Sequence, residues 1–150
     1  MTESEELAAK TRVGPGIHGD FVLPEGDLLL QQVLEFGGHT RPEVAMVASV
    51  VRAGDTIIDV GAHVGTFAIP LARQAGPTGL VCAFEPMPWS YELLLLNIEL
   101  NGLAGVIWPV DRAVSDRPGN FLAETPNQGN TGGSYLVDAA DGVSSVTLDA

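Results

Sequence analysis

The sequence has little of several residue types, and each shortage narrows what the protein can be. Its 150 residues include one cysteine, Cys82, so an internal disulfide is impossible. Its three histidines (His18, His39 and His63) are far apart and lack the spacing of metal ligands, so we expect no metal site. Only 7 lysines and arginines stand against 19 aspartates and glutamates, which gives a formal net charge of −12. Because such a charge repels phosphates at long range, the sequence predicts no nucleic-acid partner.

Long apolar runs are also missing. The longest, residues 44–51 and 93–96, are too short to cross a bilayer, so no membrane span is expected. The acidic start of the chain lacks the apolar centre of a signal peptide, and we therefore expect a cytoplasmic protein. Apolar residues still make up 45% of the chain and charged residues only 17%, which is typical of a sequence that folds.

A glycine-containing turn lies between an expected strand, residues 55–58, and an expected helix, residues 66–73. The first segment is rich in β-branched residues, and the second has the apolar spacing of a helix. The turn between them contains Gly61 and Gly65. A strand-to-helix turn of this kind is where an open α/β sheet binds its ligand.

An acidic residue ends each of the first two expected strands. Asp59 follows the first strand, and Glu85 follows the second, residues 80–84. A carboxylate at the end of the second strand can accept hydrogen bonds from the hydroxyls of a ribose. Together with the glycine turn, the two acids predict a pocket for a cofactor that contains adenosine.

The charge at the turn indicates which cofactor this is. A nicotinamide-binding turn follows Gly-x-Gly-x-x-Gly, because backbone amides must approach a pyrophosphate closely. Here His63 replaces the middle glycine, and Asp59 lies where its carboxylate would repel a pyrophosphate. S-adenosylmethionine has no phosphate and carries a cationic sulfonium and ammonium, so the acid favours this methyl donor. In the alternative interpretation, Asp59 only caps the following helix and Gly61 only permits the turn.

Strands and helices are expected to alternate along most of the chain. Residues 1–41 predict a polar lead-in and then loops and short strands (around 21–23 and 28–36) that form a cap over the pocket. The helices expected after this segment span residues 42–52, 66–73 and 88–100, with a kink at Pro70 in the second. The expected strands span residues 55–58, 80–84 and 106–110. This alternation predicts an α/β fold with a Rossmann-like, doubly wound and mostly parallel sheet.

The pattern changes after the third expected parallel strand. Residues 120–124 and 134–137 flank a polar loop and predict an antiparallel hairpin beside the pocket, and residues 144–148 predict one more strand. Three parallel strands make only half of a doubly wound sheet. We therefore expect residues 42–150 to be the N-terminal part of a longer domain whose C-terminal part is missing.

These motifs fall in the order and spacing of the FkbM-type methyltransferases, which the chain resembles over about residues 35–149. The matching segments include DVGAHVG (59–65), AFEP (83–86), LNG (100–102), NTGG (130–133) and VTLD (146–149). The resemblance implies a Rossmann-like enzyme that depends on S-adenosylmethionine. Its acceptor would be a hydroxyl of a small molecule, polyketide, glycan or lipid, although N- and C-methylation stay open.

The resemblance also implies roles for individual residues. Asp59, Gly61 and Gly65 would shape the methionine pocket, and Glu85 would hold the ribose hydroxyls. The full set expected around the cofactor is Asp59, Gly61, Ala62, His63, Gly65, Glu85, Pro86, Asp111 and Ala113, the last two beside the adenine. Asn130 and Gly132 would line the mouth of the site.

Several alternatives remain open at this point. The catalytic residues are unknown, because the segment that faces the methyl group in the family is absent here. His63 could act as a base or could only stabilise the turn. Two other functions are possible for the chain: an NAD(P)-dependent oxidoreductase, or a non-catalytic nucleotide-binding module or inactive fragment.

Overall fold

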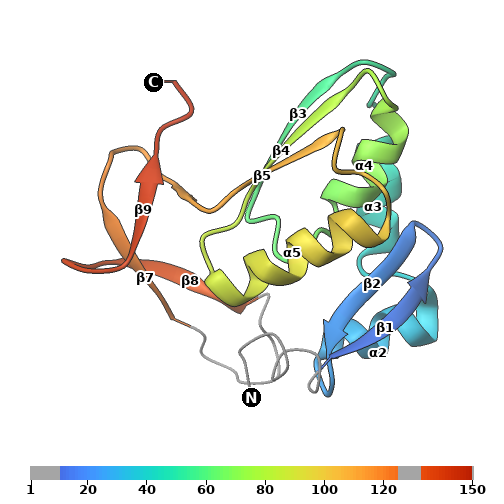
Figure 1. Ribbon diagram of the computed structural model, residues 1–150, viewed down its shortest axis with the longest axis horizontal. Coiled ribbons are helices and arrows are strands. Elements are labelled where there is room, and N and C mark those ends of the chain that lie inside the picture. The colour runs from blue at the N-terminus through green and yellow to red at the C-terminus, as the bar shows by residue number, and fades with distance from the viewer. Residues whose placement is uncertain (1–10, 125–132, 150) are drawn as a thin grey trace.

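A three-stranded parallel sheet lies at the centre of the computed structural model, which describes residues 11–124 and 133–149 (Figure 1). Its strands are β3 (Thr56–Val60), β4 (Leu80–Phe84) and β5 (Ile107–Val110), in that order across the sheet. β4 pairs with both neighbours in parallel register. The predicted α/β class with a parallel sheet is therefore confirmed. The β-branched composition of β3 explains the first of these strands, because such side chains pack well on a pleated surface.

Two crossover helices pack against the sheet, α4 (Ala68–Ala75) after β3 and α5 (Pro88–Leu100) after β4. Side chains on the covered face, such as Val81, Ala83 and Ile107, are almost completely buried. A third helix, α3 (Arg41–Ala48), precedes β3 and packs against α4. Among the described residues, no helix combines the length and the apolar character that crossing a bilayer requires.

The opposite face of the sheet is apolar and open. Ile58, Val60 and Trp108 are 52%, 53% and 63% exposed. Ile58 and Trp108 lie on either side of Cys82 in the register, so the three side chains share this face. The described helices thus cover one side of the parallel sheet, and apolar side chains occupy the other.

Residues 28–36 form a helix, α2 (Leu28–Phe36), where the sequence predicted loops and short strands. Asp27 caps its start, because the Asp27 side chain accepts a hydrogen bond of 2.7 Å from the Leu29 amide. Gly37 ends the helix in the left-handed conformation, with φ 72°. Asp27 and Gly37 are both visible in the sequence as helix-end signals. The other glycines and prolines near them led to the prediction of turns instead of a helix.

The boundaries of α3 and α4 differ by a few residues from the prediction. α3 ends at Ala48, four residues early, and α4 begins at Ala68, two residues late. Pro70 is therefore in the first turn of α4. Because the first four amides of a helix have no partner within it, a proline there removes no hydrogen bond, and the expected kink has no cause.

An antiparallel hairpin formed by β1 (Thr11–Gly16) and β2 (Gly19–Pro24) packs against α2 and α5. The strand expected around residues 21–23 is confirmed, and its partner β1 lies partly in the segment expected to be a polar lead-in. Phe21 and Leu23 point into the core shared with α5. The hairpin lies beside α5 in Figure 1, below the parallel sheet.

The Asn97 side chain fixes the hairpin to the rest of the molecule. It is completely buried on α5. Its Oδ1 accepts a hydrogen bond of 2.6 Å from the Val22 amide, and its Nδ2 donates to the Val22 carbonyl at 3.2 Å and the Val64 carbonyl at 2.9 Å. One turn later, Asn101 makes the same kind of paired contact with the backbone of Asp20. The two amides extend the backbone pairing of β2 onto a helix.

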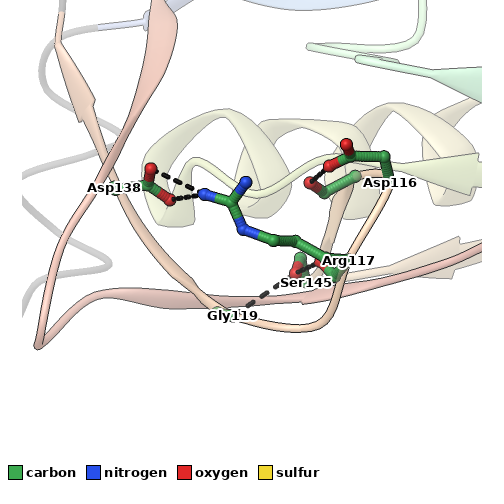
Figure 2. A network of polar contacts seen from close by, with 6 residues as sticks. Asp116, Arg117, Gly119, Asp138 and Ser145 are labelled. Atoms are coloured by element: carbon green, nitrogen blue, oxygen red, sulfur yellow. Dashed lines mark hydrogen bonds and ion pairs between the residues drawn. The ribbon is translucent and has the colours of Figure 1, made fainter.

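A second sheet follows β5 and has the strand order β6–β9–β7–β8. Its strands are β6 (Ala113–Val114), β7 (Asn120–Glu124), β8 (Tyr135–Asp138) and β9 (Val143–Val146). The antiparallel pairing of β7 and β8 confirms the expected hairpin. Figure 2 shows Arg117 beside it, with both Asp138 carboxylate oxygens accepting from Arg117 Nη2 at 2.7 Å. The Ser145 hydroxyl donates to the carbonyl of Arg117 at 3.0 Å.

Asn97→Ala should destabilise the folded state by about 2–4 kcal/mol, because it leaves buried backbone groups of Val22 and Val64 without partners. Urea unfolding followed by circular dichroism measures the change. Asn101→Ala is the matched control on the same helix face and should cost less, because Asn101 is only partly buried. Equal stability of Asn97→Ala and the wild type would contradict the assigned role.

Candidate functional site

The turn between β3 and α4 is held by hydrogen bonds to the end of β4. The amides of Gly61 and Ala62 both donate to the carbonyl of Phe84, each at 2.9 Å. Gly61 and Gly65 have φ of 76° and 94°, which favours glycine. A Cβ on Gly65 would also lie 3.0 Å from Leu94 Cδ1 on α5, so the Leu94 side chain would have to shift to admit it. The two glycines thus set the path of the turn.

The Glu85 side chain supports the turn from the end of the neighbouring strand. It is 4% exposed. Its Oε2 accepts a hydrogen bond of 2.8 Å from the His63 amide, and its Oε1 accepts one of 2.9 Å from the Met87 amide. Burial raises the pKa of Glu85, the two backbone donors oppose that rise, and the charge of Asp59 adds to it. Each carboxylate oxygen retains acceptor capacity for a further hydrogen bond.

His63 has a left-handed backbone, with φ 52°, which is uncommon for a residue other than glycine. Burial lowers the pKa of its imidazole, the charge of Asp27 opposes this, and His39 adds to the lowering. The side chain is therefore neutral at pH 7.

Two hollows meet at the Gly61–His63 turn. The first, of about 210 Å³, lies between the ends of β3 and β4 and strand β8. The second, of about 370 Å³, lies between the turn and α2. Gly61 and His63 line both hollows, so a single elongated ligand could occupy the two. Ligand sites are commonly about 300–1,000 Å³, a range that the two hollows together reach.

Asp59 is the residue of β3 two positions before Gly61. It is not among the described residues that line the two hollows. It accepts a hydrogen bond from the Ala68 amide at the start of α4, as the capping interpretation expects. Its Oδ2 is buried and has no hydrogen-bond partner among the described residues. Burial raises the pKa of Asp59 to about 6, and the Ala68 amide opposes the rise. An uncompensated buried carboxylate of this kind favours a cation nearby.

The structure brings together most, but not all, of the residues that the sequence singled out. Those that line the first hollow are Gly61, His63, Glu85, Pro86 and Ala113. Ala62 is buried behind the turn, and Gly65 packs against α5.

Asp111 directly follows β5, as the sequence predicted, but it is not among the described residues that line the first hollow. Its exposed carboxylate forms an ion pair with Arg112 and lines a neighbouring hollow instead of the first one. The end of β5 is the expected position, but the side chain turns outward. Asn130 and Gly132 lie outside the described residues.

Several lining residues were missed by the sequence analysis. In the first hollow they include Met87, Arg112, Val114, Ser134, Tyr135 and Leu136, and in the second they include Asp27, Gln32, His39 and Thr66. The prediction of a hairpin beside the pocket pointed to the β8 residues without naming them. The residues of α2 were missed because the helix itself was missed.

Comparison with known proteins places these features in a family. The sequence pattern of the TRM5/TYW2 methyltransferase domain matches residues 31–125. A tRNA(Phe) (4-demethylwyosine(37)-C(7)) aminocarboxypropyltransferase of Methanocaldococcus jannaschii is 39% identical over 61 residues. That match covers 41% of this chain, and the chain spans only 24% of the relative's length.

Solved structures share the fold. TYW2 of P. horikoshii, in complex with MeSAdo, has a TM-score of 0.54 and 21% identity, over 74% of this chain and 39% of that one. The tRNA m1G37 methyltransferase of M. jannaschii has a TM-score of 0.52 and 21% identity, over 73% and 34% of the two chains. The α/β fold with a parallel sheet is thus that of class I methyltransferases.

The comparisons correct three expectations. The resemblance to FkbM-type enzymes is wrong, because the matching family is a different one. Some residues of the motifs behind it serve the fold: Gly65 packs against Leu94, and Gly102 ends α5 with φ 66°. The expectations of a small-molecule acceptor and of no nucleic-acid partner are also wrong, because the named relatives are tRNA enzymes.

The physical error lay in the net charge, which sums over the whole chain, whereas a nucleic acid is recognised by local groups. The match to a methyltransferase family supports the predicted methyltransferase class. It disfavours the alternative of an NAD(P)-dependent oxidoreductase. The chain belongs to the TRM5/TYW2 methyltransferase domain family.

Proposed function

We propose that this chain binds S-adenosylmethionine across the two hollows and forms part of a transferase domain that modifies tRNA. The observation that supports this most directly is the meeting of the two hollows at a turn braced by Glu85. S-adenosylmethionine is an elongated molecule with an adenosine end and a methionine end. When bound, it supplies a carbon group on a cationic sulfur that an acceptor can attack.

The first hollow suits the adenosine end. Glu85 retains acceptor capacity on both oxygens, so ribose hydroxyls could donate to it while the backbone bonds persist. Met87, Ala113 and Leu136 offer an apolar surface for the adenine, and Tyr135 offers a partly apolar one. Pro86 continues this wall from the end of β4.

The second hollow suits the methionine end. It is lined by groups that can bond an ammonium and a carboxylate, namely Asp27, Gln32, His39 and Thr66. The buried Asp59 carboxylate lies behind the turn and favours positive charge on the ligand side, even without direct contact. In this proposal, Asp59 acts through the electric field of its carboxylate and through the hydrogen bond that it accepts from the Ala68 amide of α4.

The tRNA substrate is proposed from the relatives. One is named for transfer of an aminocarboxypropyl group and another for methylation of a guanine in tRNA. Both groups are substituents on the sulfonium of S-adenosylmethionine. The same bound donor would serve either reaction, and the position of the methionine end in the second hollow would determine which carbon faces the acceptor.

Glu85→Ala should weaken S-adenosylmethionine binding by about 1–3 kcal/mol, through the loss of charged hydrogen bonds to the ribose. Isothermal titration calorimetry measures the affinity, and circular dichroism checks that the variant is folded. Glu99→Gln, on the exposed side of α5, is the matched control and should bind as the wild type does. An unchanged affinity of folded Glu85→Ala would remove Glu85 from the ribose site.

Asp59→Asn should stabilise the ligand-free protein at neutral pH. The pKa of Asp59 is about 6 in the folded state against an ordinary 3.8. The folded state therefore binds the proton more tightly, and stability falls as the pH rises from about 4 to about 6. The amide cannot ionise but still accepts from Ala68.

The expected gain of Asp59→Asn over the wild type is about 1–3 kcal/mol at pH 7.5 and close to zero at pH 4. Urea unfolding at the two pH values measures both differences. A gain of the same size at both values, or a loss at pH 7.5, would contradict the raised pKa.

A further inference from the structure

A third hollow, of about 730 Å³, lies between the β1–β2 turn, the end of α2 and the start of α3. A hydrogen bond of 2.8 Å from the Ile17 amide to the Gly37 carbonyl joins the hairpin turn to the loop between the helices. Gln32 and His39 line both this hollow and the second one, so the two are neighbours. A substrate bound in the third hollow would therefore lie close to the proposed methionine end of the cofactor.

Arg41 gives this hollow a positive charge, and the part of the chain that the structure describes has no carboxylate in ion-pair contact with it. Its Nη1 donates to the backbone carbonyl of Phe36 at 3.0 Å, a neutral partner. Arg112 and Arg117, by contrast, each pair with an aspartate. The remaining N–H groups of Arg41 have the geometry to hold a phosphate.

The other polar groups of the hollow can donate or accept hydrogen bonds. Burial lowers the pKa of His18, and the charge of Arg41 adds to this. Burial also lowers the pKa of His39, although the charges of Glu43 and Asp27 oppose it. Both imidazoles are thus neutral at pH 7.

Two apolar side chains are exposed at the edge of the same hollow. Phe36 is 56% exposed and Ile17 is 59% exposed. An exposed aromatic ring beside an arginine is the combination on which single-stranded nucleic acids bind, because a base stacks on the ring and its phosphate contacts the cation. Thr40 lines the hollow as well, and its hydroxyl oxygen has no hydrogen-bond partner among the described residues.

The charge around the hollow limits the length of nucleic acid that it can hold. Glu43 and Asp27 lie close enough to His39 to affect its pKa, although neither is among the described residues that line the hollow. The chain as a whole carries a net charge of −12. A duplex or a long backbone path would meet this negative field, whereas one nucleotide meets mainly Arg41.

We propose that the third hollow binds one unpaired nucleotide of an RNA substrate, with the base against Phe36 and Ile17 and the phosphate on Arg41. This inference rests on the proposed tRNA substrate and adds a contact site for it outside the cofactor hollows. It predicts that an RNA with an unpaired loop binds more tightly than a fully paired RNA of equal length.

Fluorescence anisotropy with a labelled RNA stem-loop tests the inference. Arg41→Gln and Phe36→Ala should each weaken binding, by about 5- to 100-fold for the lost stacking or phosphate contact. Arg41→Gln should also reduce the slope of log affinity against log salt by about 0.7. S-adenosylmethionine affinity, measured on the same samples, should not change.

Matched controls separate this site from general effects. Arg117→Gln removes a positive charge from the second sheet, and Leu34→Ala removes an exposed apolar side chain from α2, so both should bind RNA as the wild type does. Phe36→Leu keeps an apolar side chain without the ring, and it provides a folded variant if Phe36→Ala fails to fold. Its RNA affinity should also fall.

Four results would overturn the inference. One is unchanged RNA affinity of folded Arg41→Gln and Phe36→Leu. Another is equal weakening by Arg117→Gln. The third is competition by a polyglutamate peptide as strong as that by unlabelled RNA, which would indicate an acidic protein partner. A wild-type chain that binds S-adenosylmethionine but no RNA would also overturn this inference, while leaving the cofactor proposal intact.

Discussion

The Glu85 carboxylate is the group on which the candidate site depends, because it connects the ends of two strands. One oxygen accepts from the His63 amide in the turn after β3, and the other accepts from the Met87 amide just before α5. A buried carboxylate is costly unless donors satisfy it, and these two amides do so. The turn, the end of β4 and the start of α5 are therefore held in one geometry, and the two hollows meet there.

Asn97 holds the same turn from the opposite side. Its amide bonds the carbonyl of Val64 in the turn and both backbone groups of Val22 in β2. The hairpin and α2, which lines two of the hollows, are thereby fixed relative to the glycine turn. This network explains how a segment outside the central sheet can form a wall of the proposed cofactor and RNA sites.

Much of the central sheet could be predicted from local signals, whereas the site could be predicted only in part. The bounds of β4 and α5 match the prediction, because an apolar run is flanked by turns and because Pro88 and Gly102 mark the helix ends. The direction of the Asp59 and Asp111 side chains depends on packing and ion pairing. The acceptor class could not be predicted, since whole-chain charge says little about a local contact such as Arg41.

A crystal structure of the protein with S-adenosylhomocysteine, the product of methyl transfer, tests the central claim most directly. The account predicts ribose hydroxyls within hydrogen-bond distance of Glu85, while Glu85 still accepts from the His63 amide. It also predicts that the homocysteine part crosses the Gly61–His63 turn into the hollow beside Asp27 and His39. A ligand that lies in one hollow alone, or a Glu85 carboxylate turned away from the ribose, would contradict it.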